Sequence, residues 1–187
     1  MNREMKKTVF VVALMTLVVA GCAPWRYIGK EGTTWGQGPF TGTLPTGWVK
    51  MDSDMLLLTR SGTSLEKIEI IRYAVDKELP INKKKFTVGM LPQEAAQVLI
   101  DEMTLDKTMN NFQVIENRPV KLGEVPAFKL ILTFNNDDGK KSRTILYGFV
   151  MDKWLYEIRY IAAQQHYFDS SVKDFETFVL GLQIKAH

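Results

Sequence analysis

The sequence predicts an α+β domain in which an antiparallel β-sheet of about six strands is covered by a central helix and a C-terminal amphipathic helix. Three observations lead to this prediction. Apolar side chains alternate through three consecutive segments between residues 125 and 162, as in a β-meander. They also recur at helical spacing twice, after residue 91 and again after residue 168. Helices must cover the sheet, because its strands carry aromatic side chains that would otherwise face water.

Residues 1–21 have the organisation of an export signal. Arg3, Lys6 and Lys7 make the start of the chain basic, and an apolar stretch follows over residues 9–20. Twelve residues of helix span about 18 Å, well short of the hydrocarbon core of about 30 Å. The segment is therefore predicted to be a signal peptide and not a stable membrane-spanning helix.

The segment Val19-Ala20-Gly21-Cys22 closes the signal and resembles the bacterial lipobox, in which small residues precede a cysteine. The resemblance implies cleavage between Gly21 and Cys22, a thioether-linked diacylglyceryl group on Cys22, and a further acyl chain, typically palmitate, on the new amine. Cys22 is the only cysteine in the chain, so no intramolecular disulfide can form. The alternative is cleavage by the ordinary secretory peptidase, which leaves a free cysteine near the N-terminus.

The expected location is the cell envelope, with the domain in the periplasm and a lipid holding it to a membrane. Ala23 follows the cysteine. By resemblance to the sorting rule of Gram-negative enterobacteria, this residue favours the outer membrane. Removing the leader takes three basic residues and one acid from totals of 24 and 21, which leaves a formal charge of about +1. That charge gives no reason to expect a nucleic-acid partner.

Three parts of the chain are expected: the signal peptide at 1–21, a lipidated N-terminus and flexible tether at 22–46, and a single α+β domain at 47–187. Frequent glycines and prolines in the tether predict a lack of regular structure. A flexible coil of about 24 residues has an end-to-end distance of roughly 25–30 Å, enough to hold the domain off the bilayer. Two alternatives remain open for the aromatic residues of this segment, which either fold back on the domain or lie at the lipid interface: Trp25, Tyr27, Trp35 and Phe40.

The domain is expected to begin with two strands, over residues 55–60 and 67–75, followed by a loop or edge segment over 77–86. Pro92 suits the first turn of a helix, and apolar residues at helical spacing predict about 16 residues of helix from Leu91. Phe112 to Leu122 is predicted to be an edge or broken strand because it contains Pro119.

Strands are predicted over residues 125–135, 142–151 and 154–162, joined by a hairpin at 136–139 and a tight turn at 152–153. The last helix is expected to start near Asp169 and Ser170 as caps. Its apolar face falls within one arc: Phe168, Val172, Phe175, Val179 and Leu182.

Short motifs recur in order along these elements: Leu44-Pro45-x-Gly47-Trp48, Gly123-x-x-Pro126-Ala127, Tyr160-x-Ala162, Phe168-Asp169 and Asp174-Phe175-Glu176. With the long hairpin and the order of elements, they resemble the PsbP-like superfamily. That superfamily is named after an extrinsic subunit of photosystem II and also contains a nuclear-import factor that binds the Ran GTPase. The resemblance covers about residues 44–184 and implies the fold. The matching residues are turns, aromatics and helix-face positions, so it transfers no ligand-binding residue.

Few residues suggest catalysis or metal binding. His166 lies in a polar stretch, His187 is the last residue, and neither has a His or Cys partner at metal-ligand spacing. We interpret His166 as a solvated histidine, with a general base as the alternative, and the oxygen-rich turn at 135–138 as ordinary turn chemistry, with a Ca²⁺ site as the alternative. Lys83, Lys84 and Lys85 are interpreted as a solvated loop, with contact to anionic headgroups as the alternative. No metal, no cofactor beyond the covalent lipid on Cys22, and no catalytic residue are therefore expected.

The leading hypothesis is a non-enzymatic envelope lipoprotein that binds a protein partner or helps to assemble a complex, with membrane contact through its lipid anchor. The alternative is a small-ligand or lipid-binding module. Its pocket would lie between the sheet and the helices and be lined by aromatic and aliphatic residues: Phe128, Leu130, Tyr147, Phe149 and Tyr156.

Overall fold

The computed structural model describes residues 25–185. The signal peptide, the Gly21/Cys22 cleavage site, Ala23 and His187 lie outside the described residues. In chain order the elements are β1 (Arg26–Tyr27), β2 (Thr33–Gln37), β3 (Phe40–Leu44), β4 (Val49–Met51), β5 (Leu56–Thr59), β6 (Glu66–Ala74), α2 (Pro92–Leu105), β7 (Asn110–Leu122), β8 (Val125–Asn135), β9 (Lys141–Met151), β10 (Trp154–Ala163), α3 (Tyr167–Gly181) and β11 (Gln183–Ile184).

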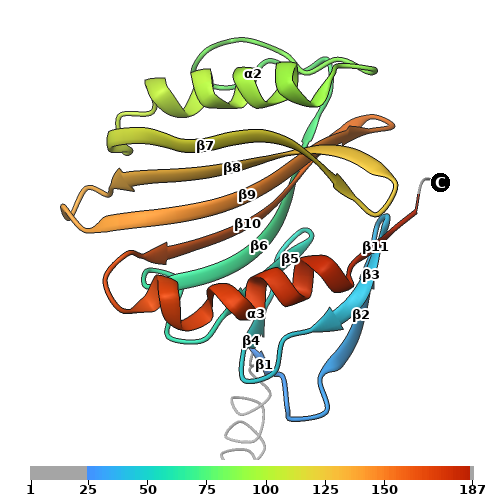
Figure 1. Cartoon of the computed structure of the whole chain (residues 1–187), viewed down its shortest axis with the longest axis vertical. Helices are drawn as coiled ribbons and strands as arrows, with labels where there is room; N and C mark the ends of the chain where they lie inside the picture. The colour runs from blue at the N-terminus through green and yellow to red at the C-terminus, as the bar shows by residue number, and fades with distance from the viewer. Residues whose placement is uncertain (1–24, 186–187) are drawn as a thin grey trace, which may run out of the picture.

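The elements form three layers, with the main sheet between α2 on one side and α3 on the other (Figure 1). The main sheet is antiparallel and has eight strands in the order β1-β4-β5-β6-β10-β9-β8-β7. A smaller sheet, β11-β3-β2, lies beside α3. The α+β class and the two covering helices are confirmed, but the predicted number of about six strands is wrong. The missed strands of the main sheet, β1 and β4, have two and three residues, too short for an alternating pattern.

The meander β8-β9-β10 is confirmed and forms the centre of the sheet. Each strand alternates side chains between the two faces, and both faces are buried, so apolar residues occupy both sets of positions. The connecting turns use residues that adopt positive φ, Gly139 at 73° and Asp152 at 54°. At the far edge, β7 runs continuously through Pro119 and pairs with β8 alone, with two register shifts.

The two helices begin differently from each other. Pro92 starts α2, and the Leu91 amide donates to Glu94 Oε2 at 3.0 Å, which satisfies one free amide of the first turn. Helix α3 begins at Tyr167, near the predicted start, but the prediction that Asp169 and Ser170 cap it is wrong because both lie within its first turn. The hydroxyl of Tyr160 lies 3.0 Å and 3.1 Å from the carbonyl oxygens of Tyr167 and Phe168, so the sheet itself holds the first turn.

Separate cores fill the two sides of the sheet. On one side, α2 and the 75–91 segment cover Phe128, Leu130 and Leu155. On the other side, α3 and the β2-β3 hairpin enclose an aromatic cluster built around Trp48, Phe149 and Tyr160.

The prediction of a flexible tether is wrong for residues 25–46, because this segment contains β1, β2 and β3. Trp35 and Phe40 fold back on the domain and are 7% and 0% exposed, and their rings stack at 6.4 Å. Trp25 and Tyr27 behave differently and are 57% and 68% exposed. Glycines that suggested flexibility instead make turns, such as Gly38 at a φ of 56° between β2 and β3.

Phe40→Ala tests this boundary. The ring contacts Phe149 and Tyr156 with centroids 6.0 Å and 5.3 Å away, so its removal leaves a cavity in the core. The free energy of unfolding is expected to fall by about 3–5 kcal/mol, measured by urea denaturation. Thr41→Ala, at an exposed position of the same strand, is the control and is expected to change it by less than about 0.5 kcal/mol. Equal effects of the two substitutions would indicate that this segment is a tether and not part of the folded domain.

Candidate functional site

Helix α2 packs over β7, β8 and β9, so the same side of β10, β6 and β5 extends beyond the helix. We call this surface the open face. Register pairing places its members side by side, with Glu157 opposite Ile71 and Arg159 opposite Glu69. Leu57 lies opposite Glu69 on the next strand. The open face comprises Leu57 of β5, Lys67, Glu69, Ile71 and Tyr73 of β6, and Glu157, Arg159 and Ile161 of β10.

Charged side chains form a linked cluster on the open face. Arg159 Nη2 lies 2.7 Å from Glu69 Oε1, and Arg159 Nη1 lies 3.5 Å from Glu157 Oε2. Lys67 Nζ is 3.1 Å from Glu69 Oε1, at the outer end of the cluster. Glu157 is fully buried and Glu69 is 8% exposed, so the acidic partners lie beneath the basic ones.

Glu157 is the unusual member of the cluster. Among residues 25–185 neither of its carboxylate oxygens has a hydrogen-bond partner, and the Nε of Arg159 also has none. Burial raises the pKa of Glu157 to about 7, against the opposing effect of Arg159. Arg159, 3.5 Å away, offsets only part of the cost of burying this charge, so the carboxyl keeps its proton up to about pH 7. Burial, and then the nearby Glu157, also raises the pKa of Tyr73 to about 12.

The enclosure around Glu157 comes from the neighbouring strand. Glu157 lies opposite Gly148 of β9, and the ring of Phe128 from β8 occupies the space above that glycine. On the other side, Tyr73 packs near Phe86 of the loop between β6 and α2, with ring centroids 6.3 Å apart. The cluster is therefore enclosed by the core on one side and reaches solvent only in part, through Lys67 and Arg159.

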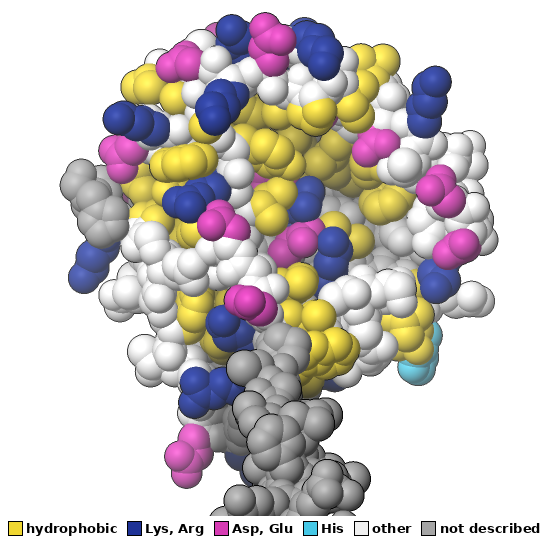
Figure 2. Space-filling view, turned by 180° about the vertical axis from the view of Figure 1, so that it is seen from behind, with side chains coloured by type: hydrophobic (Ala, Val, Ile, Leu, Met, Phe, Trp, Pro, Cys, Tyr) yellow, Lys and Arg dark blue, Asp and Glu magenta, His cyan; other side chains and the backbone are white. Residues whose placement is uncertain are grey.

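The outer edge of the open face is hollowed. A pocket of about 200 Å³ lies beside β5 and β6 and includes Leu57, Glu69 and Ile71 in its lining, with Asp54 and Arg72 paired at 3.1 Å. The rear face of the molecule has a hollow in which hydrophobic side chains are interspersed with both basic and acidic ones (Figure 2). Mixed surfaces of this kind suit a macromolecular contact better than a closed small-molecule cavity.

The raised pKa of Glu157 predicts a pH-dependent stability. Because the folded state binds this proton more tightly than the unfolded chain does, the free energy of unfolding falls as the pH rises through about 4.5 to 7. At about 1.4 kcal/mol per pKa unit the loss approaches about 3 kcal/mol. Glu157→Gln, which stays neutral, is expected to remove this slope in urea titrations, whereas Glu176→Gln at an exposed position retains it. An unchanged slope in Glu157→Gln would exclude a buried, protonated Glu157.

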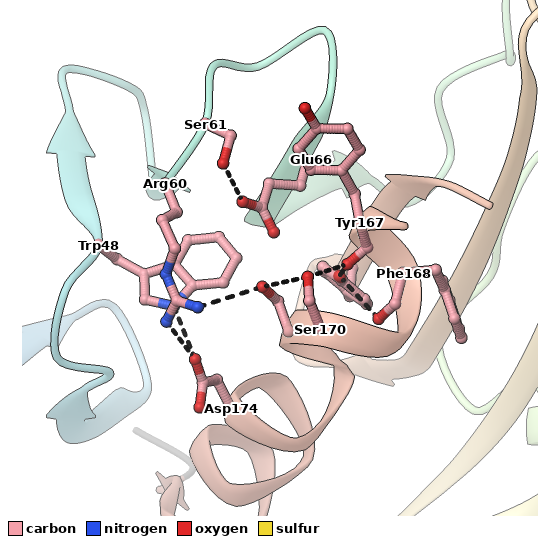
Figure 3. A network of polar contacts seen from close by, with 10 residues as sticks. Trp48, Arg60, Ser61, Glu66, Tyr167, Phe168, Ser170 and Asp174 are labelled. Atoms are coloured by element: carbon pink, nitrogen blue, oxygen red, sulfur yellow. Dashed lines mark hydrogen bonds and ion pairs between the residues drawn. The ribbon is translucent and has the colours of Figure 1, made fainter. Parts of the chain in front are cut away.

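A second polar network fastens α3 to Trp48, just before β4, and to Arg60, just after β5 (Figure 3). Arg60 pairs with Asp174 of α3, donates to Ser171 Oγ at 3.3 Å, and lies 5.1 Å from the centroid of the Trp48 ring. The Trp48 Nε1–H donates to Asp174 at 3.2 Å. Nearby, the Ser61 hydroxyl donates to the buried Glu66 at 2.8 Å.

Asp174 of this network also lines a groove of about 560 Å³ between α3 and the turn after β3. The lining is mainly threonine and aliphatic, and its charged members are Lys173 and Asp174. We therefore interpret this network as a structural attachment of α3, and we take the open face as the candidate functional site.

The residues singled out from sequence are scattered. His166 is exposed just before α3, with its ring 5.3 Å from Tyr167. The oxygen-rich turn is closed by Asn136, whose side chain accepts from the Lys140 amide at 2.8 Å. Within residues 25–185 no group of three or more His, Cys, Asp or Glu side chains is placed to hold a metal ion.

The three consecutive lysines lie on an exposed loop and have local partners. Lys84 pairs with Asp101 and lowers the pKa of that carboxyl through a hydrogen bond. Lys85 lies 3.7 Å from Glu78, and Lys83 donates to the Pro80 carbonyl at 2.6 Å. This arrangement matches the solvated-loop interpretation.

The pocket proposed from sequence does not form, because its residues lie on opposite sides of the sheet. Phe128 and Leu130 belong to the core under α2. Phe149 and Tyr156 belong to the core under α3, and Tyr147 packs against it. The sequence shows which residues of one strand share a face. It does not show which residues of the neighbouring strand share that face, because this depends on the register between the two strands.

Sequence reasoning missed the open face. The sequence did contain a signal. Leu155, Glu157 and Arg159 are alternate residues of one strand, so the two charged side chains lie on the same face of the sheet as a core leucine. Glu69, the ion-pair partner of Arg159, is 90 residues away in the chain. The ion pair can therefore be recognised only when the strand order places β6 beside β10.

No protein-family model and no curated protein matches this sequence. Solved structures with a similar fold include LpqN, described as involved in cell envelope biogenesis of Mycobacterium tuberculosis, with a TM-score of 0.54, 14% identity, and coverage of 86% of this chain and 89% of that one. The cyanobacterial PsbP protein CyanoP from Synechocystis has a TM-score of 0.50 and 12% identity, covering 89% and 95%. A point mutant of the protein Mog1 has a TM-score of 0.54 and 11% identity, covering 83% and 96%.

These likenesses define the class of fold, which is similar to that of the cyanobacterial PsbP protein CyanoP. At such identities they concern the fold alone. Among residues 25–185, no helix has the length and apolar character needed to cross a membrane.

Proposed function

We propose that this protein is a non-enzymatic lipoprotein of the cell envelope, anchored through a lipid on Cys22, whose domain binds a protein partner through the open face. The observation that carries the binding role is the open face itself. It combines partly buried Leu57, Ile71 and Ile161 with the side chains of Lys67 and Arg159, which are 28% and 17% exposed. Aromatic and aliphatic side chains around a partly desolvated arginine are the usual composition of a binding surface.

The anchoring role is supported by the basic and apolar leader and by the small residues before Cys22. Two or three acyl chains at about 0.8 kcal/mol per buried CH₂ give a lasting attachment. Ala23 supports the outer membrane, with the domain in the periplasm, if the cell is Gram-negative. LpqN, which has a similar fold, is described as involved in cell envelope biogenesis, and this supports an envelope location but not a particular membrane.

Photo-crosslinking in intact cells tests the partner role. A benzoylphenylalanine replaces Ile71 at the centre of the open face, and a matched probe replaces Leu180, which is 87% exposed on α3 at the other side of the sheet. We expect a protein adduct of one discrete mass from position 71 and none from position 180. The adduct is also expected to disappear when Leu57→Asp is added, since Leu57 borders the same surface.

Two results would contradict the proposal: no protein adduct at position 71, or equal adducts at both positions. An adduct that adds only a small mass to the chain would instead favour the small-ligand or lipid-binding alternative. Circular dichroism of each variant checks that the fold is retained.

The absence of catalysis is part of the proposal. His166 is the residue that tests it, since it is the histidine considered above as a general base. Any hydrolytic activity of the purified protein that is lost on His166→Ala would overturn this part.

A further inference from the structure

The N-terminal end of the domain is fixed in the fold at one place. Ile28 is 1% exposed, its amide donates to the Trp48 carbonyl at 2.8 Å, and its carbonyl accepts from the Gly47 amide at 2.9 Å. Arg26 and Tyr27 pair with Lys50 and Val49 as the outermost strand of the main sheet. From residue 26 onward, therefore, the chain cannot swing freely.

This fixed point is close to the proposed lipid in covalent terms. Cys22 precedes Arg26 by four residues, and a fully extended chain of that length spans at most about 14 Å. A lipid on Cys22 would thus hold the β1–β4 edge within about 15 Å of the acyl chains. The longer stand-off expected from a 24-residue tether is not available, because that segment is folded.

The side chains at this edge have the chemistry of a membrane interface. Trp25 and Tyr27 are exposed by 57% and 68%, unlike Trp35 and Trp48, which are buried. Trp and Tyr are enriched where headgroups meet acyl chains, because each has an apolar ring with a polar tip. Around them, Arg26, Lys30 and Lys50 outnumber the two acids Glu31 and Asp52 within residues 25–31 and 49–52. Cations near an anionic leaflet contribute about 1 kcal/mol each.

We propose that the β1–β4 edge lies directly on the phospholipid surface, with Trp25 and Tyr27 in the headgroup region and Arg26, Lys30 and Lys50 near lipid phosphates. This inference rests on the proposed lipidation of Cys22. The domain then sits against the bilayer in a restricted orientation, because one lipid attachment and two aromatic contacts act at the same edge.

Fluorescence quenching by brominated lipid tests the inference. The full, processed protein is reconstituted into vesicles of phosphatidylethanolamine and phosphatidylglycerol, with and without bromine on the acyl chains near the headgroup. We expect the bromines to quench part of the tryptophan emission and Trp25→Phe to lose most of that quenching. Trp154→Phe is the matched control and is expected to retain it, since Trp154 packs against Arg72 at 4.4 Å within the domain.

The outcomes separate this inference from the proposed function. If the protein sediments with the vesicles but bromine leaves its emission unchanged, the anchor stands and the membrane-contact inference is wrong. If Trp25 is also shielded from iodide under those conditions, the edge is covered by protein, such as a second copy, and the inference is equally contradicted. If the processed protein carries no lipid and does not sediment with the vesicles, the proposed anchor itself fails.

Discussion

Gly148→Ala is expected to destabilise the domain by about 3 kcal/mol or more, because a Cβ there makes the closest contact among the glycines of residues 25–185. A Cβ at Gly148 would lie 2.2 Å from Phe128 Cζ and 2.7 Å from two further ring carbons. Phe128 is completely buried under α2 and has no free space to move into. Relief of the clash must therefore separate strands β8 and β9 at the centre of the sheet, beside Glu157. Urea denaturation monitored by far-UV circular dichroism measures the effect.

The matched control is Gly29→Ala. A Cβ at Gly29 meets nothing within 4 Å, so its effect is expected to stay within about 0.5 kcal/mol. Phe128→Ala should partly rescue Gly148→Ala, because the two substitutions share one contact and their effects cannot be additive. Additive losses, or equal effects at the two glycines, would contradict the packing of Phe128 over Gly148.

Trp48→Ala is expected to cost about 3–5 kcal/mol. The indole is 0% exposed, its ring centroid lies 6.5 Å from that of Tyr160, and its Nε1–H donates to Asp174. The substitution therefore removes core volume and one of the contacts that fasten α3. The change in the free energy of unfolding is the quantity to measure.

Trp48→Phe separates the ring from the hydrogen bond. It keeps most of the apolar volume and loses the donor, so a cost nearer 1–2 kcal/mol is expected, at about 1 kcal/mol per hydrogen bond plus the smaller ring. Lys173→Ala, an exposed position of α3 in the same turn as Asp174, is expected to be nearly neutral. Equal stability of Trp48→Ala and the unmodified protein would exclude the network as the attachment of α3.

The meander was readable from sequence because its alternation is long and regular. The predicted strand at 125–135 coincides with β8, and the next two differ from β9 and β10 by one residue. Helix α2 was predicted within two residues at each end, because Pro92 marks its start and its apolar spacing is clear. The spacing of apolar residues was sufficient to predict an element wherever that element was long enough for the spacing to repeat.

The β2-β3 hairpin was missed because the frequent glycines and prolines of this segment suggested a flexible chain, and its strands are too short to show a clear alternation of apolar residues. Strands β2 and β3 have five residues each and include Gly36 and Gly42, which weaken any strand signal. The informative residues were Trp35, Phe40 and Leu44, whose burial depends on contacts with α3 and the distant strands β9 and β10. A segment this short is folded by its tertiary contacts, which sequence periodicity does not contain.

The candidate site was unpredictable for a related reason. Charged residues in strands usually face water, and nothing local distinguishes Glu157 from an exposed glutamate. Its burial results from the glycine on one neighbouring strand, the ring above that glycine, and the strand on the other side. Membrane contact at Trp25 and Tyr27 likewise became arguable only once Ile28 was found fixed in the sheet.

The most direct test of the whole account is the fate of Cys22→Ser in the native host, followed by membrane fractionation and gel mobility. A serine hydroxyl does not replace the thiol as the acceptor of the lipid. The account predicts that the variant accumulates as the larger, uncut precursor and never appears as the lipidated mature form in the membrane fraction. A variant that is cut to the same size as the unmodified protein and stays with the membranes would contradict it.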